Sequence, residues 1–152
     1  MTPQVFIDIT RFELKKRAEK YKADGWRFVN ACGSLLDLDK ESSDKGVVEM
    51  LYTFARGREM ENLRFNVQPG EVLESITDLY FNALVNENEA HDLFGIEIKG
   101  IVIDFGGAFY TLSIPTPMNP QSNIAIRAAE EKTYGAADYG ACPVPTSSDQ
   151  ES

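Results

Sequence analysis

Three apolar segments suited to β-strands lie one after another in the middle of the chain, with only polar loops between them. They cover residues 26–38, 47–55 and 63–67. In the third segment Leu63, Phe65 and Val67 alternate with polar residues, the period of two expected of a strand with one face in water. Gly33 is a candidate position for a β-bulge in the first segment. Because successive strands joined by short loops pair side by side in opposite directions, the sequence predicts an antiparallel meander.

A helical pattern is found on each side of this meander. The first helix is expected over residues 9–23 and opens with Thr10 and Glu13, which have the spacing of a capping box. The second is expected from an N-cap at Ser75 to about Leu93, with apolar residues three and four apart. These elements predict an α+β fold: a two-layer sandwich of a mixed, mostly antiparallel sheet with two main helices on one face.

The C-terminal part of the chain has a different composition. Short strands or extended chain are expected around residues 96–103 and a strand at 109–114, and from Pro115 onward Pro, Gly, Ala and Ser become frequent. Such a segment cannot build a core of its own. We therefore expect an α+β domain over residues 1–115 and an extended tail over residues 116–152 that is either disordered or bound to a partner.

Charge and cysteine content exclude several classes of function. The net charge is −9, which argues against nucleic-acid binding because phosphate contacts need clustered Lys and Arg. No apolar run approaches the roughly 20 residues of a membrane span, and the N-terminus does not resemble a signal peptide. Cys32 and Cys142 lie far apart and neither belongs to a CxxC motif, so we expect no metal or iron–sulfur site built by this chain alone.

The end of the second helix carries several titratable residues. Glu87 continues the apolar stripe of this helix, where a carboxylate is costly unless something pairs with it. One explanation is a metal site, since Glu87 and His91 are four residues apart on one face. Another is general acid–base catalysis by Glu87, Glu89, His91 or Asp92. A third is a structural or interfacial role, in which the carboxylates hold the helix end to a loop or to a partner's Arg or Lys.

The residues alone favour the third explanation. His91 is the only histidine of the chain, and no cysteine lies near it in sequence to complete a metal site. No nucleophile or phosphate-binding glycine loop accompanies the acidic residues, and Gly106-Gly107 is expected to be a turn. Catalysis and metal binding nevertheless remain open as alternatives at this point.

The same run resembles the hallmark of the complex I 30 kDa-subunit family, whose members include a subunit of respiratory NADH dehydrogenase. That hallmark reads approximately Glu-Arg-Glu-x-x-Asp-hydrophobic-Phe-Gly-Ile. Six residues match it position by position: Glu87, Glu89, Asp92, Phe94, Gly95 and Ile96. The segments Leu73–Tyr80 and Gly25–Phe28 also resemble the family, and the similarity covers roughly residues 10–101.

Two departures separate this chain from the respiratory members of the family. Asn88 stands where the family usually has arginine. The respiratory members usually continue into Gly-His-Pro-Asp-Leu and an arginine-rich stretch, whereas this chain continues from Gly100 as Gly-Ile-Val-Ile-Asp-Phe. In this respect it resembles the shorter, divergent forms of Ech-type and CO-induced energy-converting [NiFe] hydrogenases.

The resemblance implies a cofactor-free, non-catalytic structural subunit in the peripheral arm of a membrane-bound energy-converting [NiFe] hydrogenase. It would pack against the [NiFe] large subunit and the [4Fe-4S] small subunit on the cytoplasmic face of the membrane, and reach the membrane subunits indirectly. The complex would couple ferredoxin-linked proton reduction to ion translocation. The expected interface or structural residues are Glu87, Glu89, Asp92, Phe94, Gly95 and Ile96. The alternatives are the equivalent subunit of an NADH- or F420H2:quinone-type dehydrogenase, and a stand-alone α+β binding module whose motif match is accidental.

Overall fold

A mixed four-stranded sheet forms one layer of the molecule. The computed structural model describes residues 4–36 and 46–119. The sheet has the order β1-β4-β3-β2, with β1 at Val5–Asp8, β2 at Arg27–Leu35, β3 at Val48–Arg56 and β4 at Glu59–Val67. Strands β2, β3 and β4 are the predicted antiparallel meander, and β1 pairs with β4 in parallel. The predicted mixed, mostly antiparallel sheet is confirmed.

The bulge in β2 lies elsewhere than predicted. The register shifts between Phe28 and Asn30, whereas Gly33 pairs in register with Met50. Gly33 has a different reason to be a glycine, because a Cβ atom there would lie 3.0 Å from a ring carbon of Phe94. The missing side chain thus lets the second helix approach this strand closely.

The N-terminal helix follows the sequence prediction. A 3-10 turn, η1 (Arg11–Glu13), leads into α1 (Leu14–Ala23). The Glu13 carboxylate accepts hydrogen bonds from the Thr10 backbone N–H at 2.7 Å and from the Thr10 hydroxyl at 2.9 Å, as the capping-box spacing indicated. Strand β1 was not predicted from the sequence. It has only four residues, most of them exposed, and they do not alternate between buried and exposed positions.

The second helix, α2 (Ala83–Phe94), begins later than predicted. The Ser75 hydroxyl does accept the Thr77 N–H at 3.0 Å, as a cap would, but only turns follow. The reason is that the same hydroxyl is bonded to Glu87 in the middle of α2, at 2.5 Å. Ser75 is bonded to the middle of α2 and therefore cannot also be the N-cap of that helix. The predicted end is confirmed, because Gly95 takes a left-handed conformation (φ 66°) and ends α2.

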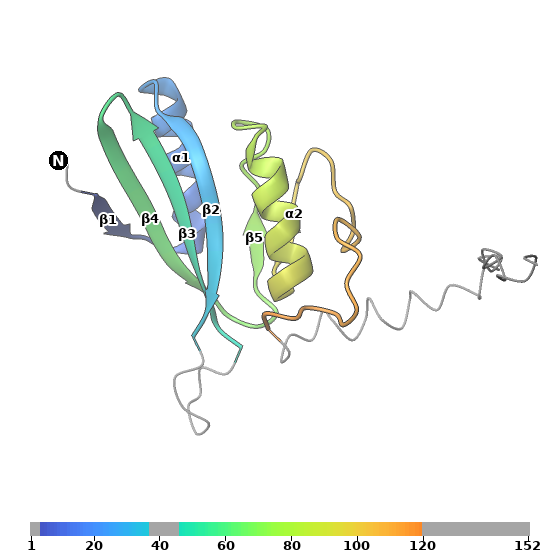
Figure 1. Ribbon diagram of the computed structural model, residues 1–152. Helices are drawn as coiled ribbons and strands as arrows, with labels where there is room; N and C mark the ends of the chain where they lie inside the picture. Colours follow the sequence, from blue (N-terminus) through green and yellow to red (C-terminus); the bar gives the residue numbers. More distant parts are fainter. Residues whose placement is uncertain (1–3, 37–45, 120–152) are drawn as a thin grey trace, which may run out of the picture.

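A second, two-stranded sheet lies next to α2. It consists of β5 (Val72–Glu74) and β6 (Glu97–Lys99), paired in parallel. The predicted strand at 109–114 is wrong: residues 100–119 contain only turns, bends and irregular chain. Figure 1 shows this irregular segment passing along the side of α2 that faces away from the four-stranded sheet.

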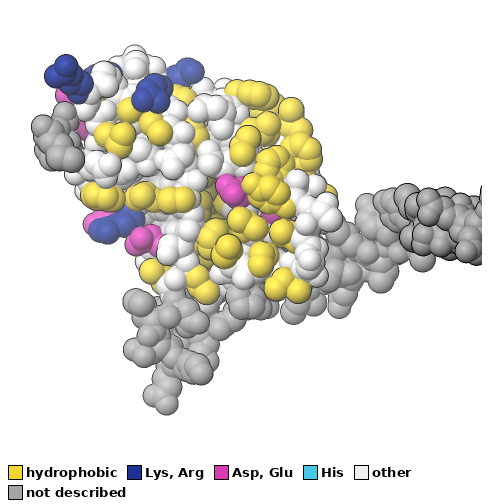
Figure 2. Space-filling model, viewed as in Figure 1, with side chains coloured by type: hydrophobic (Ala, Val, Ile, Leu, Met, Phe, Trp, Pro, Cys, Tyr) yellow, Lys and Arg dark blue, Asp and Glu magenta, His cyan; other side chains and the backbone are white. Residues whose placement is uncertain are grey.

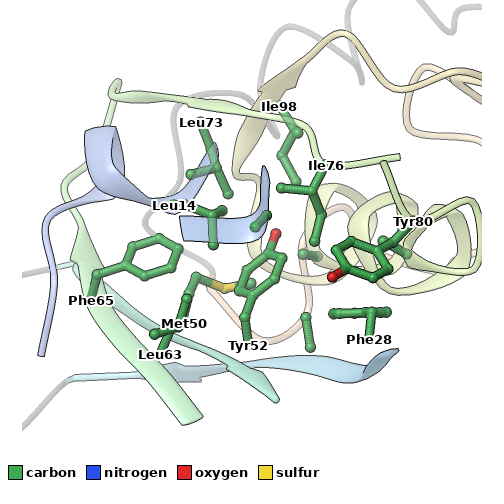
Figure 3. Packing of buried hydrophobic residues seen from close by; sticks show 14 of the residues in the cluster. Leu14, Phe28, Met50, Tyr52, Leu63, Phe65, Leu73, Ile76, Tyr80 and Ile98 are labelled. Carbon is green, nitrogen blue, oxygen red and sulfur yellow. The ribbon is translucent and has the colours of Figure 1, made fainter. Parts of the chain in front are cut away.

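One continuous core joins the two layers. Met50, Tyr52 and Phe54 alternate along β3, lie on the same face of the sheet and are fully buried. Residues of both helices, such as Leu14 and Ala83, belong to the same core. Figure 3 shows the Tyr52 ring between Met50 and the layer that contains Ile76 and Ile98. The predicted α+β class is therefore confirmed. Within residues 4–36 and 46–119, no helix has the length and apolar character to cross a bilayer.

Candidate functional site

Glu87 lies at the centre of the site and is completely buried. Its carboxyl group receives the Ser75 hydroxyl at 2.5 Å and the Ile76 backbone N–H at 3.0 Å. The Tyr52 hydroxyl donates a longer hydrogen bond, at 3.4 Å. These partners come from β3 and from the turn after β5, so the buried carboxyl of the second helix is bonded within the chain itself.

Burial changes the proton affinity of this group. Loss of water raises the pKa of Glu87, and the hydrogen bonds from Ser75, Ile76 and Tyr52 oppose that rise without cancelling it. The pKa of Tyr52 is raised well above its usual value, first by burial and then by the neighbouring Glu87. The carboxyl therefore binds a proton more readily than an exposed glutamate does.

A short chain of hydroxyl groups extends from Glu87. Ser75 Oγ lies 2.7 Å from Thr77 Oγ1, which in turn lies 3.4 Å from the Gly100 carbonyl oxygen and accepts the Val102 N–H at 2.9 Å. The two hydroxyls supply two protons for three contacts. Because the Ser75 hydroxyl donates to Glu87, the Thr77 hydroxyl is left to donate either to Ser75 or to the Gly100 carbonyl.

Asn88, at the position where the family usually has arginine, is also buried. Its amide nitrogen donates to the carbonyl oxygens of Leu84 at 2.9 Å and Ile103 at 3.0 Å. Its amide oxygen accepts the Phe105 N–H at 3.0 Å. The side chain therefore fixes the irregular segment to α2, a role that local sequence patterns did not indicate because its partners lie 15 and 17 residues away.

Asp92 and Glu89 hold the next part of the same segment. The Tyr110 N–H donates to Asp92 Oδ2 at 2.7 Å, and the Tyr110 hydroxyl donates to Glu89 Oε1 at 3.2 Å. Asp92 is buried, and its other oxygen, Oδ1, accepts no hydrogen bond from the residues that the structure describes. Both carboxylates thus bind the irregular segment.

The end of α2 is held in the same way. Asn119, which is buried, donates to the carbonyl oxygens of Phe94 at 3.1 Å and Gly46 at 3.2 Å. The Met118 N–H donates to the Leu93 carbonyl at 3.0 Å. Asn119 was not singled out from the sequence, and it shows that the folded part of the chain extends to this residue. The predicted boundary at 115/116 stays a prediction, since residues 120–152 lie outside the described part of the chain.

His91 turns away from Glu87. Its Nδ1 lies 2.9 Å from the Ile96 carbonyl oxygen and must be the donor there, because a carbonyl only accepts. His91 also lines a groove of about 430 Å³ together with Lys99 and Asp104. Gly107 lies beside the ring, since a Cβ at that position would be in ordinary contact with Nε2 at 3.4 Å, and its φ of 78° is one that favours glycine.

The predicted motif residues therefore separate into distinct places. Glu87 faces the turn after β5, Glu89 and Asp92 face Tyr110, and His91 faces Ile96. Phe94, Gly95 and Ile96 pack or terminate the helix end, and Ile96 is buried. Among the described residues, no three His, Cys, Asp or Glu side chains are grouped so that they could hold a metal ion. That the six residues contact another subunit stays a prediction.

Comparisons with known proteins agree with this fold. The chain is similar in structure to a chain of a membrane-bound sulfane sulfur reductase, an archaeal respiratory membrane complex, with a TM-score of 0.58 and 14% sequence identity. The similarity covers 91% of this chain and 82% of that one. No curated protein matches it in sequence. The family model of the respiratory-chain NADH dehydrogenase 30 kDa subunit matches residues 7–102, more than half of the chain. Together with the motif on α2, this match makes the protein a member of the 30 kDa-subunit family of complex I-like respiratory complexes.

Proposed function

We propose that this subunit belongs to the peripheral arm of a membrane-bound energy-converting [NiFe] hydrogenase. The observation that carries the proposal is the sequence after the family motif. The respiratory members usually have Gly-His-Pro-Asp-Leu and an arginine-rich stretch, whereas here Gly100 is followed by Ile-Val-Ile-Asp-Phe. Residues 100–119 contain one charged residue, Asp104, and no arginine. A chain without those arginines needs a different surface on its partners.

The contacts of α2 support a structural rather than a catalytic role. The buried polar groups Glu87, Asn88 and Asp92 are all engaged in hydrogen bonds that hold parts of this chain together. Buried polar networks of this kind fix one conformation. The chain would thus supply a rigid shape, while electron transfer from ferredoxin to protons takes place in the [NiFe] large subunit and the [4Fe-4S] small subunit. Separate membrane subunits would translocate the ion and hold the complex on the cytoplasmic face of the membrane.

Two related complexes are the other candidates. The first is an NADH- or F420H2:quinone-type dehydrogenase, which the family match itself brings into consideration. The second is a sulfur-reducing membrane complex, because the structurally similar chain comes from a sulfane sulfur reductase. The family match argues against the third alternative, a stand-alone binding module with an accidental motif. The match extends well beyond the motif, over residues 7–102.

Isolation of the native complex through an affinity tag on this chain would distinguish these candidates. The expected result is a complex that contains nickel by elemental analysis and evolves H2 from reduced ferredoxin. Its large subunit should have two CxxC motifs that ligate the [NiFe] centre. A nickel-free complex that oxidises NADH or F420H2, or that reduces polysulfide, would contradict the proposal and select the corresponding alternative.

A further inference from the structure

Exposed apolar side chains are concentrated on one part of the molecule. The irregular segment that passes along α2 exposes six of them, which together we call the apolar face: Val102, Ile103, Phe105, Tyr110, Ile114 and Met118. Val85, one helical turn before Glu89 on α2, is also exposed, at 48%. Figure 2 shows hydrophobic side chains gathered over α2 and the segment beside it. Contiguous exposed apolar surfaces of this kind are typical of protein contacts.

The segment that carries this face is held by buried polar side chains. Asn88 fixes it at Ile103 and Phe105, and Asp92 fixes it at Tyr110. Burying an amide or a carboxylate is costly unless hydrogen bonds compensate for the lost water. Here the hydrogen-bonded side chains of Asn88 and Asp92 position the segment. The large apolar side chains of the segment itself are exposed and contribute little to the core. The backbone is therefore fixed in advance of contact, which lowers the entropic cost of binding.

The charges around the face indicate what kind of surface it fits. Its neighbouring charged groups are Glu89 and Asp104, and neither forms an ion pair with any described residue. Lys99 lines the same groove as Asp104 but lies beyond salt-bridge distance from it. Residues 82–98 and 100–119 contain no Lys or Arg, and no basic side chain is visible over this part of the surface in Figure 2. The acidic groups thus lack a cationic partner within the described part of the chain.

This charge pattern argues against two occupants. A membrane surface with anionic lipids would repel an acidic face that has no Lys or Arg. A second copy of the chain, placed symmetrically on the same face, would bring like charges together. A protein surface that combines apolar side chains with an arginine or lysine would satisfy both the apolar area and the acidic groups.

We propose that the apolar face is the docking surface for another protein subunit, one that presents apolar side chains together with at least one Arg or Lys opposite Glu89 or Asp104. The inference rests on the proposed function only in taking the partner to be a fellow subunit of the complex. It does not depend on whether that complex is a hydrogenase. Of the six motif residues only Glu89 borders this surface, and most of the others are wholly or largely buried.

Site-specific photo-crosslinking in the native complex would test the docking surface directly. A benzoylphenylalanine residue would replace Ile114, which is 61% exposed, and in a control chain it would replace Phe12, which is 75% exposed outside the face. The expected product joins position 114 to a peptide of another subunit that contains Arg or Lys near the cross-link. Cross-links from position 114 to residues 120–152 or to a second copy of the chain would overturn the proposal, as would the absence of any product.

Substitutions would measure how much the face contributes. Ile114→Asp should reduce the amount of this chain that remains in the isolated complex at least about tenfold, as expected of a buried apolar contact, whereas Ile114→Leu should change little. Circular dichroism and thermal melting of the purified chain would verify that both variants fold. An Ile114→Asp chain that folds and still assembles normally would contradict the docking surface.

The charge of Glu89 and Asp104 is tested with substitutions that keep the shape and the hydrogen bonds of each side chain. Asp104→Asn keeps the acceptor for the Gly106 N–H, and Glu89→Gln keeps the acceptor for the Tyr110 hydroxyl. The double variant should assemble more weakly than the wild-type chain at low salt, and its assembly should be less sensitive to added salt. Identical salt dependence would show that no cation faces these groups. A nickel-free complex in which Ile114→Asp nevertheless dissociates would refute the hydrogenase and leave the docking surface intact.

Discussion

At the scale of single residues, Glu87 is the group whose chemistry the fold changes most. It is completely buried, and burial raises its pKa above the ordinary value of 4.5. Burial therefore makes the neutral form of this carboxyl easier to populate than in an exposed glutamate. The role of this residue is then that of a hydrogen-bonding group between α2 and the turn after β5.

The raised pKa of Glu87 predicts a particular pH dependence of the protein's stability. Below the unfolded-state pKa, the folded and unfolded chains both hold the proton. As the pH rises, the unfolded chain releases it first, so the wild-type protein loses stability until the pH passes the folded pKa. Each unit of pKa difference corresponds to about 1.4 kcal/mol. Glu87→Gln mimics the neutral form and cannot titrate, so its stability relative to the wild type should increase as the pH rises from the ordinary glutamate pKa of 4.5 towards neutrality.

Urea unfolding of both proteins at several pH values would measure this difference. The exposed Glu19→Gln is a suitable control, because Glu19 lies on the solvent side of α1 and should show little change. A free-energy difference between wild type and Glu87→Gln that stays constant with pH would show that the buried carboxyl does not change its protonation between the two states.

At the scale of the elements, the close contact between α2 and β2 depends on a missing side chain. A Cβ at Gly33 would lie 3.0 Å from one ring carbon of Phe94 and 3.1 Å from another. We expect Gly33→Ala to push α2 away from the sheet and to destabilise the protein by about 1–3 kcal/mol. The neighbouring Ser34→Ala, at an exposed position of the same strand, should have little effect.

A double substitution would show that Phe94 is the cause. If the clash is with its ring, Phe94→Leu should recover part of the stability lost in Gly33→Ala, and the two changes should not be additive in a denaturant-unfolding cycle. Additive effects would place the strain elsewhere, for example against Val48, whose side chain is 3.2 Å from the same Cβ position.

Elements with a repeating local pattern were predictable from the sequence, and those fixed by distant contacts were not. The alternation in β4 and the capping box before α1 both hold in the structure. The start of α2 was misplaced because Ser75 is bonded to Glu87, and this contact has no local signature. The strand predicted at 109–114 fails for a related reason, since the Tyr110 N–H is bonded to a side chain of α2 instead of a neighbouring strand.

The candidate site shows the same division. The sequence indicated that Glu87 needed partners, because it continued an apolar stripe. It did not indicate which partners, since Tyr52 lies 35 residues away on β3. Asn88 was seen as the loss of an arginine, whereas the structure shows a buried amide with three hydrogen bonds. The residue type alone does not show whether an asparagine at this position is an exposed replacement for arginine or a buried hydrogen-bonding group.

At the scale of the whole molecule, the C-terminal tail is the part whose behaviour should depend on assembly. Its composition predicts that residues 116–152 have no core of their own, and the exposed apolar face lies mostly just before it and ends at Met118. We expect limited trypsin digestion to remove the tail, for example after Arg127 or Lys132, readily from the isolated chain and at least about tenfold more slowly from the native complex. Time courses followed by mass spectrometry would measure both rates, with cleavage of a denatured sample as the reference.

Equal digestion rates in the isolated chain and in the complex would mean that the tail does not bind a partner. Ile114→Asp adds a useful comparison, because it should free the tail in the same preparation in which it releases the chain. Protection of the tail in the isolated chain would instead point to contacts made within the chain itself.

The hydrogen bonds between α2 and the segment over residues 100–119 also have a consequence for the order of folding. The segment forms no helix or strand of its own, and its anchors Asn88 and Asp92 acquire their positions only when α2 is packed on β2. We therefore expect the segment to be among the last parts to become ordered and among the first to open in local unfolding. Until the segment is ordered, its apolar side chains are exposed on a backbone that is not yet fixed, and such transiently exposed surface is prone to aggregation, so early contact with a partner should protect the nascent chain.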